Sequence, residues 1–177
     1  MSFDWSSVYA GRARRMGASE IRELLKLLEQ PDIISFAGGI PDPDLFPLDA
    51  FQDAYGAVLG GETTAKAALQ YSLSDGLGEL REWIAGYMTR LGAPCTTANI
   101  LVTNGSQQGL EFLGRLMLSP GDPALVTWPT YLGALQAFNA YEPEYVRLDP
   151  RANAGRPELP AGAERAKFAY VVPDFAN

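Results

Sequence analysis

Apolar residues along the chain follow two spacings, one typical of helices and one typical of buried strands. The helical spacing predicts helices over residues 20–29, 48–59, 77–91 and 107–118, another from Tyr131 to about Asn139, and a short one over 158–164. Short apolar runs predict strands over residues 33–36, 100–103, 124–128, 145–148 and 168–172. Because strands alternate with helices from residue 100 onward, the fold class is α/β, with a mostly parallel sheet flanked by helices.

Length and composition fit one globular domain preceded by a short arm. The chain has 177 residues, of which 47% are hydrophobic and 20% charged, so it can build a core. We expect residues 1–46 to form an N-terminal arm and the start of a small domain. No apolar run reaches the roughly 18 residues of a membrane span, the N-terminus lacks the features of a signal peptide, and the lone Cys95 fits a reducing compartment. We therefore expect a cytoplasmic protein without a membrane partner.

Charge and residue usage argue against several classes of chemistry. The net charge of −7 disfavours a nucleic-acid partner, because phosphate contacts need clustered Lys and Arg. We interpret Arg12, Arg14 and Arg15 as a solvated basic arm. The chain has no histidine and a single cysteine, so His-dependent nucleophiles and an ordinary zinc site are not expected. If the protein is an enzyme, its chemistry should come from a cofactor.

Polar and aromatic residues follow three of the predicted strands, and ligands of open α/β sheets bind at the carboxyl ends of strands. After the strand over 100–103, Ser106 and the neighbouring backbone amides begin a helix, whose N-terminus favours a phosphate. Tyr131 follows the next strand and could cover a planar ligand, and Asn177 follows the last strand as an amide donor. The alternatives are an ordinary serine N-cap, a rim aromatic and a turn asparagine.

Five motifs in the chain resemble those of a known enzyme family. They are ISFAGGIP at 34–41 with LFP at 45–47, LQYS at 69–72, TNGSQQGL at 103–110, WPTY at 128–131 and VPDFAN at 172–177. Their order and approximate spacing resemble the fold-type-I aminotransferases that use pyridoxal 5′-phosphate, and within them the 2-aminoadipate and kynurenine aminotransferase subgroup. The resemblance covers essentially the whole chain. It implies the N-terminal part of that fold, with residues 47–177 in the large, cofactor-binding domain.

The resemblance implies a pyridoxal 5′-phosphate cofactor and the residues that would bind it. Ser106 and Gln107 would hold the phosphate, and Tyr131 would stack on the pyridine ring. Asn177 would donate a hydrogen bond to the phenolic oxygen of that ring. Tyr71 would reach the phosphate of the cofactor in a neighbouring subunit, which implies a homodimer with shared active sites.

The resemblance also implies amino-acid and 2-oxo-acid substrates, between which the whole enzyme would transfer an amino group. Gly39 would offer its backbone to the substrate, and Asn177 would lie beside the substrate carboxylate. In this subgroup the helix that holds residues 18–23 is a substrate-selecting lid, so Arg22 would meet the distal carboxylate of 2-aminoadipate or glutamate. The alternative for Arg22 is a solvated helix arginine, and aromatic or branched amino donors stay open.

Part of the family's machinery has no counterpart in this sequence. In the family, the Schiff-base lysine, the aspartate on the pyridine nitrogen and two arginines lie beyond the point that matches Asn177. We interpret Lys26, Lys66 and Lys167 as surface residues, because none stands in a matching context. The chain alone is therefore expected to be inactive, as the N-terminal part of a longer enzyme, truncated after Asn177 and dependent on its C-terminal half.

Three other interpretations remain open at this point. Another fold-type-I enzyme, such as a β-lyase, would share the cofactor-binding residues and differ in the substrate arm. A MocR-type transcription regulator has an effector domain that resembles these enzymes, but the residues before Glu20 are too few for its DNA-binding domain. The third alternative is a half-domain that serves only as an assembly partner.

Overall fold

The computed structural model describes residues 3–16, 41–149 and 159–174. The chain divides into two compact units. We call residues 40–103 the helical unit, and residues 1–39 with 104–177 the sheet unit. The predicted helix over 20–29 and the predicted strand over 33–36 lie outside the described residues.

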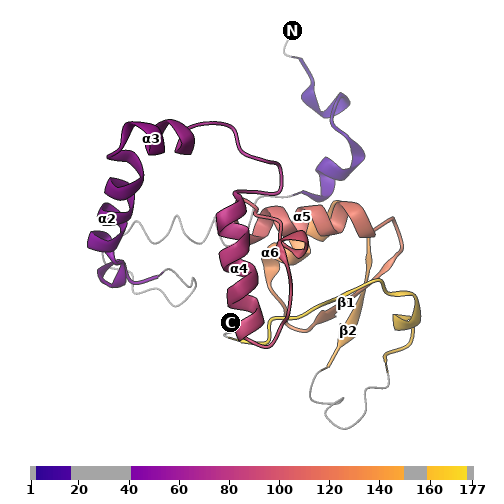
Figure 1. Cartoon of the computed structure of the whole chain (residues 1–177). Helices are drawn as coiled ribbons and strands as arrows, with labels where there is room; N and C mark the ends of the chain where they lie inside the picture. The colour runs from indigo at the N-terminus through magenta and orange to yellow at the C-terminus, as the bar shows by residue number, and fades with distance from the viewer. Residues whose placement is uncertain (1–2, 17–40, 150–158, 175–177) are drawn as a thin grey trace. The chain divides into compact units, whose positions relative to one another are not determined.

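The sheet unit is built on three parallel strands, as the alternation of strands and helices predicted. They are β1 (Pro123–Thr127), β2 (Glu144–Leu148) and β3 (Ala169–Tyr170), and β1 lies between the other two. In the register of the sheet, Leu125 of β1 faces Val146 of β2 and Ala169 of β3. Figure 1 shows the helices α5 (Gly105–Met117) and α6 (Leu132–Asn139) packed beside β1 and β2. Parallel strands need such crossover helices, which cover the sheet.

The core of the sheet unit lies between β1 and the two helices. Phe138 of α6 is 1% exposed, and Val126 of β1 is fully buried. The rings of Phe168 and Tyr170 pack against Phe138, with centroids 5.3 and 6.0 Å away. α5 and α6 approach closely at Gly114, where a methyl group would lie 3.0 Å from the ring of Tyr141 and 3.2 Å from that of Phe138. The short helix η5 (Ala163–Arg165) contacts β1 as well.

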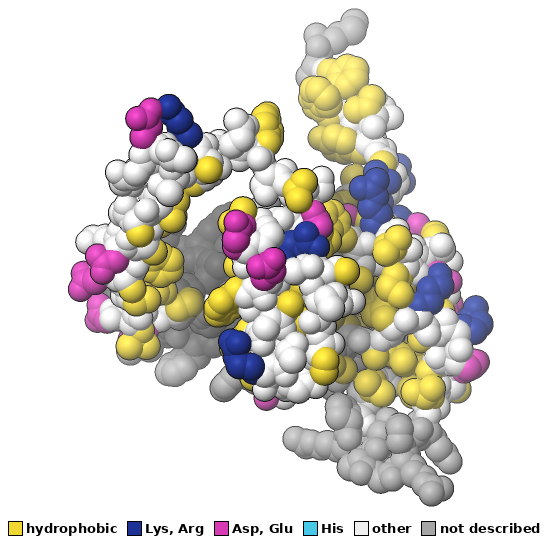
Figure 2. All heavy atoms as spheres, in the orientation of Figure 1, with side chains coloured by type: hydrophobic (Ala, Val, Ile, Leu, Met, Phe, Trp, Pro, Cys, Tyr) yellow, Lys and Arg dark blue, Asp and Glu magenta, His cyan; other side chains and the backbone are white. Residues whose placement is uncertain are grey.

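The helical unit contains α2 (Leu48–Leu59), α3 (Glu62–Ala68) and α4 (Gly78–Arg90). The bounds of α2 match the prediction, and those of α4 differ from it by one residue at each end. Among the described residues of this unit, Ala85 is the only buried hydrophobic residue, at 7% exposure. Hydrophobic side chains instead lie on the surface of α2 and α4 (Figure 2). No helix in the described ranges has the length and apolar character needed to span a membrane.

The predicted strand over residues 100–103 is wrong for the described structure. These residues pair with no strand among those described. Instead, the guanidinium of Arg81 donates to the carbonyl of Ile100 at 3.1 Å, and the amide of Val102 donates to the carbonyl of Asp75 at 3.1 Å. An apolar run becomes a strand only when a neighbouring backbone completes its ladder, and here a side chain and a turn take those hydrogen bonds.

Two further predicted elements are shorter in the structure. The strand over 168–172 is paired only at Ala169 and Tyr170, because β3 contacts β1 at just these two positions. Of the short helix predicted over 158–164, the described part forms the single turn of η5 at Ala163–Arg165.

Candidate functional site

The first turn of α5 carries Ser106 and Gln107, two of the predicted phosphate-binding residues. The helix begins at Gly105, whose φ of +75° lies in the left-handed region that favours glycine. Its N-cap is Asn104, and the side-chain oxygen of Gln108 accepts a hydrogen bond from the Asn104 amide at 2.7 Å. Ser106 is therefore not the N-cap of this helix, and its exposed side chain lies in the turn that presents backbone N–H groups.

Tyr131 stands at the N-terminus of α6, after the carboxyl end of β1. It is the N-cap residue of α6, and its side chain is 46% exposed. The hydroxyl groups of Thr127 and Thr130 form a hydrogen bond of 3.4 Å across the turn that leads to it. Trp128, in the same turn, is 55% exposed. The turn therefore presents two partly open aromatic rings at the edge of the sheet where α/β proteins bind ligands.

The structure brings the Tyr131 turn and the first turn of α5 together. The side-chain nitrogen of Gln107 donates to the carbonyl of Gly133, 3.0 Å away. Tyr170, at the end of β3, lies close enough to Tyr131 for an electrostatic interaction between the two side chains. Burial raises the pKa of the Tyr170 hydroxyl, and the neighbouring Tyr131 raises it further. A helix N-terminus and an aromatic ring thus lie side by side at the carboxyl edge of the parallel sheet.

Four other predicted site residues lie outside the described part of the sheet unit. Arg22, Gly39 and Asn177 lie outside the described residues. Tyr71 belongs to the helical unit, in the segment between α3 and α4, where its side chain is 99% exposed. That exposure is what a residue serving a neighbouring subunit needs. The roles of all four residues stay predictions.

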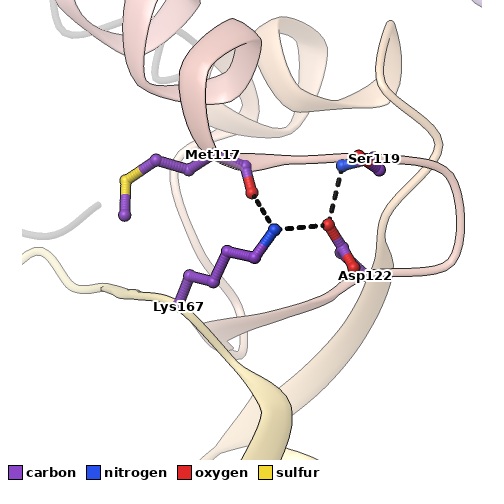
Figure 3. Close-up of polar contacts among 4 residues, drawn as sticks. All are labelled: Met117, Ser119, Asp122 and Lys167. Atoms are coloured by element: carbon purple, nitrogen blue, oxygen red, sulfur yellow. Dashed lines mark hydrogen bonds and ion pairs between the residues drawn. The ribbon is translucent and has the colours of Figure 1, made fainter.

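Lys167 has a structural role that the sequence did not reveal. Its ammonium group donates to the carbonyl of Met117, at the end of α5, and forms an ion pair with Asp122, both at 2.9 Å (Figure 3). Two hydrogen bonds lower the pKa of the Asp122 carboxyl. The larger effect comes from Lys167, and the second comes from the backbone amide of Ser119. Lys66 instead pairs with Glu62 on the surface of α3. Both lysines are exposed, as predicted, and Lys26 lies outside the described residues.

A hollow of about 440 Å³ lies elsewhere, at the amino edge of the strands. It is lined by Arg15, Asn139, Glu142 and Pro143, of which the last two precede β2. Arg15 and Glu142 form an ion pair of 2.8 Å within it, which ties the N-terminal segment to the residues that precede β2. The hollow shares no residue with the predicted site, and ligands of parallel sheets bind at the other edge.

Comparisons with known proteins show which proteins this chain is similar to. No family model matches the sequence. Aromatic-amino-acid aminotransferase 1 of Thermococcus litoralis is 40% identical over 99% of this chain and 44% of its own length. The crystal structure of the α-aminoadipate aminotransferase LysN from Thermus thermophilus, complexed with N-(5′-phosphopyridoxyl)-L-leucine, matches 98% of this chain and 42% of its own, with a TM-score of 0.78 and 36% identity.

A regulator is also among the relatives. The uncharacterized HTH-type transcriptional regulator YdcR of Escherichia coli is 31% identical over 118 residues, which is 67% of this chain and 25% of the regulator.

The fold and the matches define the family of the chain. The chain belongs to the fold-type-I aminotransferase family, as its motifs predicted. It spans less than half the length of the relatives it matches.

Proposed function

We propose that the protein is part of an aminotransferase that uses pyridoxal 5′-phosphate to move an amino group between an amino acid and a 2-oxo acid. The observation that carries the proposal is the hydrogen bond between Gln107 and Gly133, because it joins a helix N-terminus to the turn of an exposed tyrosine ring. A phosphorylated aromatic cofactor needs one group of each kind. Family membership supports the same conclusion.

The donors at the first turn of α5 fit a phosphate. A helix N-terminus combines unpaired N–H groups with the positive end of the helix dipole. Ser106 adds an exposed hydroxyl in the same turn. We therefore assign the cofactor phosphate to Ser106 and to the backbone amide of Gln107.

The Tyr131 ring fits the aromatic part of the same cofactor. It lies beside the phosphate donors, and nearly half of its surface is open to a ligand. Stacked aromatic rings attract one another beyond their simple burial of area. When bound, pyridoxal phosphate supplies the electron sink for amino transfer, and the protein contributes placement and electrostatics. Tyr131 would stack on the pyridine ring, and Asn177 would donate to its phenolic oxygen.

Substrate and subunit contacts complete the proposal. Gly39 and Asn177 would contact the α-carboxylate end of an amino acid, and Arg22 would select a distal carboxylate. The exposed Tyr71 would bind the cofactor phosphate of a second subunit, so the active protein would be a homodimer. We propose 2-aminoadipate, glutamate and aromatic or branched amino acids as the donor classes.

A calorimetric titration of the full-length protein tests the cofactor site. We expect pyridoxal 5′-phosphate to bind, and Ser106→Ala to weaken it by about 10- to 150-fold, the effect of one hydrogen bond to a charged group. Ser119→Ala is the matched control, because Ser119 precedes β1 and contributes its backbone amide, not its hydroxyl, to Asp122. Equal affinity of the wild type and Ser106→Ala would contradict the phosphate assignment.

An assay of 2-oxo acid formation separates the enzyme from the regulator. The similarity to YdcR keeps a sensor role as the second candidate, because a sensor could bind the same cofactor without turnover. We expect repeated turnover by the complete enzyme, including the C-terminal half, with 2-aminoadipate or glutamate as donor. Binding of the cofactor without turnover on any of the proposed donors would favour the sensor.

A further inference from the structure

The side chain of Gln107 reaches from the first turn of α5 to α6. Gln107 is the third residue of α5, and its carboxamide nitrogen donates to the carbonyl of Gly133, the second residue of α6. This bond spans 26 residues of sequence. The bond to α6 uses one of the two N–H donors of the carboxamide and fixes the direction of the side chain. The backbone amide of Gln107 stands in the first turn of the helix, where it can meet an anion.

Gly133 in turn lies directly under the ring of Tyr131. A methyl group at Gly133 would be 2.5 Å from Cζ, 2.6 Å from Cε1 and 2.7 Å from the hydroxyl oxygen of Tyr131. Carbon atoms in contact normally stand about 3.5–4 Å apart, so no residue with a β-carbon leaves the ring in this place. Gly133 itself is buried, whereas Tyr131 is 46% exposed. The hydroxyl end of the ring therefore rests on the Gly133 backbone, while much of its surface stays open.

We propose that Gln107 and Gly133 are positioning residues that set the ring of Tyr131 relative to the first turn of α5. Gln107 holds the Gly133 peptide, and Gly133 leaves the space of a missing β-carbon to the ring. The inference rests on the proposed function, because the distance being set is the one between the cofactor's phosphate and its ring. It gives Gln107 two separate tasks, one for its backbone amide and one for its side chain.

Three variants separate positioning from direct phosphate binding. Gln107→Met keeps the length of the side chain and removes the donor to Gly133. Gly133→Ala displaces the ring by collision with the new methyl group. Gln108→Met is the matched control, because it also removes a side-chain hydrogen bond at the start of α5, the one to Asn104, and leaves Gly133 untouched.

The first measurement needs no cofactor. Carbon-13 labelled tyrosine, with Tyr131 assigned by Tyr131→Phe, reports the ring directly by NMR. We expect the Tyr131 signal to move in Gln107→Met and Gly133→Ala and to stay in place in Gln108→Met. An unmoved signal in Gln107→Met would overturn the inference, even if Gly133→Ala failed to fold.

The second measurement uses pyridoxal 5′-phosphate, pyridoxal and inorganic phosphate as separate probes. We expect Gln107→Met to weaken pyridoxal 5′-phosphate and pyridoxal by about 3- to 10-fold, the range of one neutral hydrogen bond, and to leave inorganic phosphate unchanged. Weakening of inorganic phosphate by the same factor would overturn positioning in favour of direct binding.

A double-mutant cycle with Tyr131→Ala completes the test. If Gln107 acts through the ring, Gln107→Met causes no further loss of cofactor affinity once the ring is gone. An undiminished effect of Gln107→Met in that background would overturn the inference. Absence of pyridoxal 5′-phosphate binding in the wild type would instead contradict the proposed function, and the NMR measurement would still decide whether Gln107 positions Tyr131.

Discussion

The helical unit and the sheet unit use similar helices to opposite effect. α2 has 12 residues and α5 has 13, and both carry apolar residues at helical spacing. In α5 that spacing buries Leu110 against α6 and β1, where Phe138 and Ala124 complete a core. In α2 the same spacing leaves Phe51 58% exposed, and no residue of α2 is buried.

The difference shows that an amphipathic helix becomes part of a core only when another surface covers it. β1 is buried along most of its length and offers α5 and α6 a flat apolar face. α2 contacts α3, a helix of seven residues with no buried residue of its own. Short helices are marginal in water without tertiary packing. Stability in this chain should therefore concentrate in the sheet unit, and matched substitutions in the two units can test this.

The largest contrast is expected for one substitution made in each unit, Phe138→Ala and Phe51→Ala. Phe138 is 1% exposed, and its removal leaves a cavity, so we expect a loss of about 3–5 kcal/mol in the free energy of unfolding. Phe51→Ala exchanges an exposed ring for a better helix former, and the change should stay within about 0.5 kcal/mol. Urea denaturation followed by circular dichroism measures both.

The Phe51 variant is the more informative of the two. A loss above about 2 kcal/mol for Phe51→Ala would mean that the apolar face of α2 is buried in solution. The comparison between the units would then reflect a missing contact surface and not a difference in packing strength.

Alkaline pH should act on the sheet unit through Tyr145. Burial raises the pKa of this tyrosine to about 12, and its hydroxyl donates to Asn139 at 2.7 Å. Because the folded pKa exceeds the unfolded value near 10, the contribution of Tyr145 is complete below pH 10 and is lost as pH rises toward 12. We expect a loss of about 1–3 kcal/mol over that range.

Tyr145→Phe provides the control for the alkaline titration. The variant should be less stable at neutral pH by about 1 kcal/mol, because one hydrogen bond is gone. Its decline between pH 10 and 12 should be shallower than that of the wild type, with the raised pKa of Tyr170 accounting for part of what remains. An identical decline in both proteins would show that Tyr145 titrates normally in the folded state.

Glycine-to-alanine changes should differ in sign between the units. At Gly56 of α2 a methyl group meets nothing within 4 Å, so Gly56→Ala should stabilise the helix by roughly 0.5–1 kcal/mol. At Gly114 of α5 it would press on Tyr141 and Phe138, and overpacking of about 1–3 kcal/mol exceeds the helix gain. We expect a net loss of about 1 kcal/mol for Gly114→Ala. Thermal melts of both variants check the signs, and stabilisation at Gly114 would mean that the two rings yield easily.

The smallest contrast is between two lysines, Lys167 and Lys66. Lys167→Gln removes the bond to the last turn of α5 and the ion pair with Asp122, so the melting temperature should fall slightly (Figure 3). Lys66→Gln removes an ion pair whose two side chains are 76% and 81% exposed, and no measurable change is expected.

Stability measured at acidic pH separates the two interactions of Lys167. The pKa of Asp122 is lowered in the folded state, so its contribution is present above the unfolded value near 4 and is lost as pH falls through the folded pKa. The difference between the wild type and Lys167→Gln should shrink over that range. A difference that is independent of pH would assign the effect of Lys167 to its bond with Met117 alone.

The sequence by itself determined most of the helices and the parallel order of the strands in the sheet unit. The apolar spacing predicted α2 at its observed bounds, and the alternation of strands and helices predicted a parallel sheet. It also placed Tyr131 after the apolar run that forms β1, at the carboxyl edge of the sheet. These features depend on local periodicity and on the rule that parallel strands end at the same edge, so they can be read from neighbouring residues.

Only the tertiary structure decided how these elements are joined. Residues 100–103 are apolar enough for a strand, but Arg81 and Asp75 take their hydrogen bonds. Gln107 bonds to Gly133 across 26 residues, and Lys167 bonds to Met117 across 50. A glutamine or lysine side chain can donate hydrogen bonds to many acceptors, and the packing of distant segments decides which acceptor lies within reach. The orientation of the Tyr131 ring, which rests on a glycine two residues further along, depends on the same packing.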